Sequence, residues 1–139
     1  MEHSTVSHPI MLRLLTGTPD PSPLPADFEY SIHDPLSVTV AFGTNSDAPV
    51  RWVFARDLLS EGLDGQAGIG DVTVSPVGSP NGIPAIEIRL SSPDGDAFLR
   101  APADAIEEFL AETWRLVPPG TESQHLDIDL TLDALLDGA

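Results

Sequence analysis

Residues 96–120 read DAFLRAPADAIEEFLAETWRLVPPG, and they predict an amphipathic helix that follows the end of a strand. Apolar side chains and one threonine recur at the helical spacing i, i+3, i+4, i+7, i+8 and i+11, at Ile106, Phe109, Leu110, Thr113, Trp114 and Val117. The opposite side carries Glu107, Glu108, Glu112 and Arg115. Pro102 suits the first helical position, and Pro118-Pro119-Gly120 ends the helix. A helix with one apolar face needs a complementary apolar surface elsewhere in the chain.

Seven shorter segments with strand-like patterns supply that surface. Most of them alternate apolar and polar residues, and they lie at 10–15, 28–33, 36–42, 50–55, 72–74, 86–90 and 97–100. The short break at Asp34-Pro35 favours antiparallel pairing of its neighbours, because a parallel return needs a much longer crossover. Arg56 to Leu63, closed by Gly62, is typical of a short helix. These patterns predict an α+β fold: a curved antiparallel β-sheet or partly closed barrel of about seven strands, with two to three packed helices.

The length of 139 residues suits a single domain, which we expect to span 1–139. We expect 1–8 to be mobile and 17–26 to form a Pro-rich loop, because each proline removes a backbone donor. The last leucines fit a helix or a strand, and a short helix from about Asp129 is favoured. No secretion signal is seen and no apolar segment approaches the ~20 residues that span a bilayer, so we expect a cytoplasmic protein.

Charge narrows the classes of function. Six basic residues, all of them arginine, oppose 22 acidic residues, which leaves a net charge of −16. Binding to DNA or RNA draws on clustered lysine and arginine, and the sequence contains no such cluster. The charge predicts a well-solvated surface. A sharper hypothesis is a surface that selects a basic or weakly charged protein partner and repels polyanions.

No residue pattern predicts catalysis, a metal site or a cofactor. The chain has no cysteine, its histidines lack metal-ligand spacing, and a phosphate-binding loop is impossible without lysine. Two Asp-x-Asp pairs, starting at Asp94 and Asp127, are better explained by turns and helix capping than by calcium binding. Trp52 and Trp114 are expected in the core, with any surplus apolar area at a subunit contact.

A series of motifs gives the chain a family resemblance. VRWVFARDLL at 50–59 is followed by Gly62, GIGDV at 68–72, SSPDG at 91–95, FLAET at 109–113 and VPPGTE at 117–122. Together they resemble the SsgA-like family of sporulation and cell-division proteins of actinobacteria. The resemblance implies a whirly-like fold, in which a unit of strands followed by a helix occurs twice. The two strand-to-helix exits of this chain also look alike, although coincidence would explain that equally well.

The resemblance further implies a non-catalytic protein, located in the cytoplasm at the division septum. Such a protein helps to position the sporulation septum by recruiting FtsZ, together with an SsgA-type companion protein. The fold resemblance suggests that it acts as a homo-oligomeric docking platform, with three copies if a ring forms. Our hypothesis places part of the docking surface at six acidic residues: Glu107, Glu108, Glu112, Asp127, Asp129 and Asp133.

Two other classes of function stay open. A whirly-like single-stranded nucleic-acid-binding module would need a basic groove, which the net charge of −16 disfavours. A small-molecule-binding or enzymatic domain would need a concave pocket with converging polar groups.

Overall fold

The computed structural model describes residues 4–15, 21–78 and 82–125. Its elements follow the chain in this order: β1 (Thr5–Leu15), β2 (Ser22–Ser31), β3 (Asp34–Phe42), β4 (Val50–Ala55), α1 (Arg56–Gly62), β5 (Val72–Val77), β6 (Ala85–Ser92), β7 (Gly95–Pro102), α2 (Ala103–Leu116) and a 3-10 turn (Glu122–His125). Four strands and a helix are thus followed by three strands and a helix. Within the described ranges, no helix is long and apolar enough to cross a bilayer.

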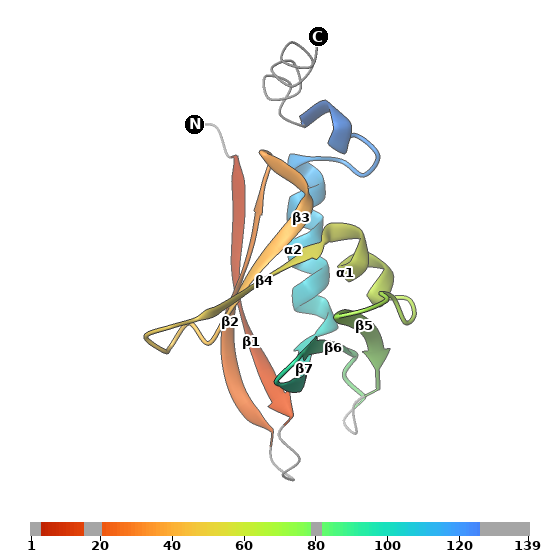
Figure 1. Ribbon diagram of the computed structural model, residues 1–139. Coiled ribbons are helices and arrows are strands. Elements are labelled where there is room, and N and C mark those ends of the chain that lie inside the picture. The colour runs from red at the N-terminus through yellow and green to blue at the C-terminus, as the bar shows by residue number, and fades with distance from the viewer. Residues whose placement is uncertain (1–3, 16–20, 79–81, 126–139) are drawn as a thin grey trace.

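All seven strands belong to one antiparallel sheet with the order β4-β3-β2-β1-β7-β6-β5. The first four strands form a meander, the last three form another, and β1 joins the two by pairing with β7. That central pairing is short, because it aligns only Arg13–Leu15 with Phe98–Arg100. The sheet curls around α2, and α1 packs beside it (Figure 1). The predicted α+β fold with a curved antiparallel sheet is therefore confirmed.

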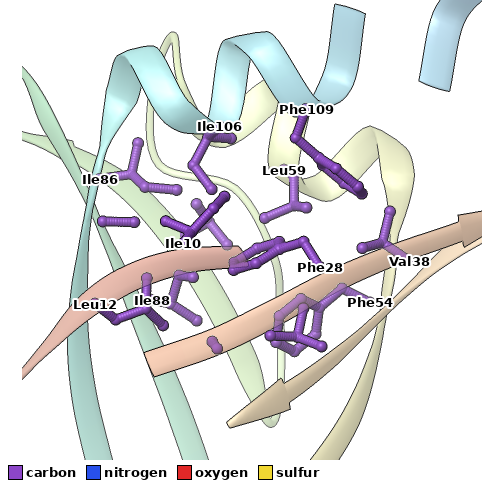
Figure 2. Close-up of a cluster of buried hydrophobic side chains, with 14 of the residues drawn as sticks. Ile10, Leu12, Phe28, Val38, Phe54, Leu59, Ile86, Ile88, Ile106 and Phe109 are labelled. Carbon is purple, nitrogen blue, oxygen red and sulfur yellow. The ribbon is translucent and has the colours of Figure 1, made fainter. Parts of the chain in front are cut away.

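The core lies between the concave face of the sheet and α2. Side chains of α2 point toward strand residues such as Ile10 and Phe28 (Figure 2). The rings of Phe28 and Phe109 meet edge to face, with centroids 5.6 Å apart. The predicted helix stripe is buried except for Trp114, which is half-buried. Trp52 is also half-buried against the core, so the expectation for both tryptophans holds only in part.

Strand β2 corrects the Pro-rich loop expected at 17–26. It begins at Ser22, so Pro23 and Pro25 are strand residues that lie opposite Arg13 and Met11 of β1. Pairing with β3 starts only at Ala26, so both prolines occupy a stretch where one side of β2 has no neighbouring strand. A missing N–H is tolerated at such an edge. The loop prediction treated every proline as a strand breaker and ignored this case.

The amino-terminal segment gives a second correction. We expected 1–8 to be mobile, but Thr5 to His8 belong to β1 and pair with Phe28 to Ser31 of β2. Residues 1–3 lie outside the described residues. Val6 and His8 share the inward side of β1 with Ile10, so the alternation that predicted the strand simply continues further back.

Glycine 62 ends α1 for a reason other than the one the sequence suggested. The residue after it, Leu63, has right-handed backbone angles, so no left-handed cap is present. A Cβ atom at Gly62 would instead lie 2.2 Å from the Val74 Cγ1 atom on β5. Glycine is needed here because α1 and the sheet approach each other closely. The start of α2 also differs from the prediction, because Pro102 lies one residue before the helix rather than at its first position.

Candidate partner-binding surface

The acidic face of α2 is defined by Glu107, Glu108 and Glu112. Burial of Ile106 and Phe109 fixes the rotation of the helix, and this turns Glu107 and Glu108 into solvent. Neither forms an ion pair with any described residue. The helix is long and well packed, so it fixes the backbone positions from which these two carboxylates project into solvent. Three other predicted surface residues, Asp127, Asp129 and Asp133, lie outside the described residues.

Glu112 differs from its two neighbours because it already has a partner. Its Oε2 atom contacts Nε2 of His8 on β1, with side-chain exposures of 43% and 25% respectively. The His8 ring also stands edge-on to Phe109, with centroids 5.7 Å apart. The contact ties the start of β1 to α2 and leaves Glu112 only partly available to another molecule. Sequence reasoning did not single out His8. The alternation of β1 places its side chain on the same inward side of the strand as Ile10, and this signal could have identified it.

Sequence reasoning also missed a buried cluster around Arg56. This side chain is 1% exposed at the start of α1. Its Nη1 atom donates to the carbonyl oxygens of Thr113 and Val117, at 3.1 and 2.7 Å. Its Nη2 atom donates to Glu122 Oε2 at 2.7 Å. Because a guanidinium presents several fixed donors, one arginine connects α1, the end of α2 and the 3-10 turn.

The same arginine changes the ionisation of its neighbours. Its hydrogen bond to Glu122 is the main reason that the pKa of this carboxyl lies below the ordinary value of 4.5. Its guanidinium carbon also lies 4.9 Å from the centre of the Tyr30 ring. Burial raises the pKa of Tyr30, and the nearby positive charge opposes that rise. The Tyr30 hydroxyl donates to the Pro35 carbonyl at 2.8 Å. The cluster therefore has a structural role, in which two nitrogens of Arg56 join distant segments and its Nε atom has no acceptor.

Two open clefts flank the core. One of ≈ 520 Å³ has mainly aliphatic and aromatic walls from Leu14, Leu24, Phe42, Val50, Trp52, Leu90, Ala97 and Leu99, with Ser92, Asp94, Gly95 and Asp96 also on its lining. Of these, Asp96 is engaged by Arg89 at 2.8 Å and by Ser91 at 2.7 Å. A second cleft of ≈ 430 Å³ lies beside the acidic face of α2, between the start of β1 and the residues Glu112, Arg115 and Leu116. Among the described residues, no three His, Asp or Glu side chains gather to hold a metal ion.

Fold and site together define a class of small, strongly acidic α+β proteins, in which a curled antiparallel sheet encloses one long helix and exposes its carboxylates. Comparison with known protein families identifies the particular family within this class. The family described as "Streptomyces sporulation and cell division protein, SsgA" matches residues 24–122, and the chain belongs to that family. The family resemblance seen in the sequence motifs is thereby confirmed.

Individual relatives agree with this assignment. The sporulation-specific cell division protein SsgB of Streptomyces coelicolor is 46% identical over 134 residues, which cover 96% of this chain and 97% of that protein. SsgB of Kineococcus radiotolerans is 47% identical over 121 residues, covering 86% and 73%. A crystal structure of the SsgA-like sporulation-specific cell division protein from Thermobifida fusca has a TM-score of 0.85 at 37% identity, covering 96% of this chain and 98% of that one. A solved SsgB structure linked to longitudinal cell division during sporulation of Streptomyces coelicolor has a TM-score of 0.84 at 46% identity, covering 90% and 99%.

Proposed function

We propose that this protein helps to position the sporulation septum by recruiting FtsZ, and that it does so by binding alone, without catalysis. Its membership of the SsgA family supports a role in sporulation and cell division. In this proposal it works in the cytoplasm at the division septum, together with an SsgA-type companion protein.

The observation that carries the proposal is the acidic face of α2. Glu107 and Glu108 are exposed, lack an ion-pair partner among the described residues, and stand on a helix whose other side is buried. Two exposed carboxylates of this kind favour a basic or weakly charged protein surface and disfavour polyanions. The adjoining cleft beside Glu112 and Arg115 offers a hollow next to these charges. We infer that Asp127, Asp129 and Asp133 add further negative charge to the same surface.

Self-association would strengthen such a surface. A ring of identical copies presents the same acidic face several times, and a polymeric partner can then engage several copies at once. Each further contact is intramolecular, so the overall affinity rises without any new kind of contact. We propose a homo-oligomer, with three copies, as the working form.

Co-sedimentation with polymerised FtsZ tests the acidic face. We expect the variant E107K/E108K to lose most of its co-sedimentation with FtsZ, because each substitution replaces a negative charge with a positive one at a proposed contact position. The matched control D47K/D71K makes the same change in net charge at two exposed loop positions away from α2. Binding that is unchanged in E107K/E108K, or equally reduced in both variants, would refute the proposed surface. A third variant, D127N/D129N/D133N, tests the carboxy-terminal acids separately.

Light scattering distinguishes two errors: a wrong proposal of FtsZ recruitment and a wrong placement of the binding surface. We expect the purified chain to give the mass of an oligomer, and a larger mass after FtsZ is added. If the parent protein leaves FtsZ unbound, recruitment by direct contact is wrong. If the parent protein binds but E107K/E108K binds equally well, only the placement of the surface is wrong.

A further inference from the structure

The convex face of the sheet, on the side away from both helices (Figure 1), carries two arginines side by side. Arg13 of β1 and Arg100 of β7 are directly opposite each other in the central pairing of the sheet. Their neighbours Leu12, Leu99 and Ala101 are buried in the core, so strand alternation turns both arginines outward. Like charges at directly opposed positions destabilise a sheet. The fold brings these two charges together although they are far apart in the sequence.

Neither arginine forms a close ion pair within the described part of the chain. Arg56 and Arg89 form close ion pairs at 2.7 and 2.8 Å, and Arg51 reaches Glu29 at 4.0 Å. Arg13 and Arg100 form no such pair, even though Glu87 of β6 lies opposite Arg100 in the register. The Nε atom of Arg100 is also buried without an acceptor. Arg56 Nε is buried in the same way, so this atom does not mark a site; the donors that an incoming carboxylate can reach are the terminal guanidinium nitrogens.

Apolar side chains flank the two charges. Met11 shares the outward side of β1 with Arg13 and is 54% exposed, and Phe98 shares the outward side of β7 with Arg100 and is 38% exposed. We call Met11, Arg13, Phe98 and Arg100 the arginine patch. Its chemistry is unusual for this chain, whose net charge is −16. It combines two available guanidinium groups with two exposed apolar groups.

The surroundings of the arginine patch favour one kind of anion over another. Asp27 and Glu29 lie on the same face of β2, and Glu87 lies beside Arg100 on β6. A phosphate chain that ran across this face would meet these carboxylates after only two favourable contacts. A protein segment can place its acidic residues at the two arginines and an apolar residue beside them, over Met11 or Phe98. The patch therefore fits a short acidic and apolar segment better than a nucleic acid.

We propose that the arginine patch is a second docking surface, which binds a partner-protein segment that carries two carboxylates and a neighbouring apolar side chain. The carboxylates accept hydrogen bonds from Arg13 and Arg100, and the apolar side chain packs on Met11 or Phe98, which lie at either end of the arginine pair along the strands. This surface is opposite in charge to the acidic face of α2 and lies on the other side of the sheet. It does not depend on the proposed recruitment of FtsZ.

Fluorescence anisotropy tests the arginine patch with a labelled peptide in which two aspartates flank a phenylalanine. We expect saturable binding that weakens as salt is added. The variant R13Q/R100Q should bind about tenfold more weakly or not at all, whereas R115Q should bind like the parent. Arg115 is a control for the loss of one exposed arginine outside the patch, because it lies on α2 and also lacks an ion pair among the described residues. A peptide with asparagines in place of the aspartates should bind weakly to every variant.

Thermal unfolding of the same variants guards against a purely structural effect. R13Q/R100Q relieves the repulsion between Arg13 and Arg100 but loses the attraction between Arg100 and Glu87, so it should melt within a few degrees of the parent. Equal peptide binding by parent and R13Q/R100Q, or equal binding of the aspartate and asparagine peptides, overturns the proposal. Displacement of the peptide by a single-stranded oligothymidylate would favour a nucleic-acid site instead. A fall in mass for R13Q/R100Q in light scattering, with the parent binding no peptide, would assign the patch to contact between copies of this chain.

Discussion

Replacing Arg56 with alanine should be among the most destabilising single changes in this protein. Arg56→Ala removes the donor from the buried Val117 carbonyl, and it removes one of the two donors of the Thr113 carbonyl, which keeps the Val117 N–H at 2.8 Å. Each unsatisfied buried acceptor costs about 1–3 kcal/mol, and breaking a buried charged contact typically costs about 3–5 kcal/mol in all. A domain of this size is stable by roughly 5–15 kcal/mol, so we expect a loss of about 3–5 kcal/mol. The corresponding fall in melting temperature is roughly 10–20 °C.

Urea unfolding followed by circular dichroism measures this loss. Arg115→Ala is the control, because the side chain is exposed and its removal should change the free energy of unfolding by no more than about 0.5 kcal/mol. Arg56→Lys keeps the positive charge but not the forked set of donors, so it should fall between the parent and Arg56→Ala. A loss below about 1 kcal/mol for Arg56→Ala would refute the reasoning, since it would mean that water or neighbouring donors satisfy the Val117 carbonyl.

Three further changes test other parts of the structure. Gly62→Ala should destabilise the protein by about 1–3 kcal/mol, because its Cβ atom would lie 2.2 Å from a methyl carbon of β5. The control Gly65→Ala, whose Cβ atom would have no neighbour within 4 Å, should be nearly neutral in thermal unfolding. The pKa of Glu122 lies below 4.5 in the folded protein, so the folded state binds fewer protons than the unfolded one, and this contribution to stability is present above pH 4.5 and lost as the pH falls. The stability difference between the parent and Glu122→Gln, measured by urea unfolding, should therefore shrink below pH 4.5, and a difference that stays constant would contradict the assignment. Leu12→Ala should cost about 2–5 kcal/mol, whereas Met11→Ala beside it, at 54% exposure, should cost far less; equal losses would contradict the assignment of the two faces of β1.

Much of the fold could be predicted from the sequence, because the signals are local. The spacing of apolar residues in α2 and their alternation in the strands state which side of each element is buried. That pattern was enough to expect α2, α1 and a curved antiparallel sheet. It failed where a local rule had a tertiary exception, as at Pro23 and Pro25, which the structure accommodates beside an unpaired stretch of β2.

The candidate surface was predictable only in part. The exposure of Glu107 and Glu108 follows from the helical period alone, since the buried stripe fixes the opposite face. The partner of Glu112 does not follow from it, because His8 lies 104 residues away in the sequence. Asp127, Asp129 and Asp133 remain predictions.

By itself the sequence determined the elements, the buried face of each, the strong negative charge and the family. Only the tertiary structure decided the order of the strands, because a pattern with a period of two selects a face but not a neighbour. Pairing of β1 with β7 is what places Arg13 opposite Arg100. The burial of Arg56 has the same origin, since its acceptors come from the far end of α2 and from Glu122. Contacts between distant segments form only when the whole sheet has closed around α2, and no local stretch of residues contains that information.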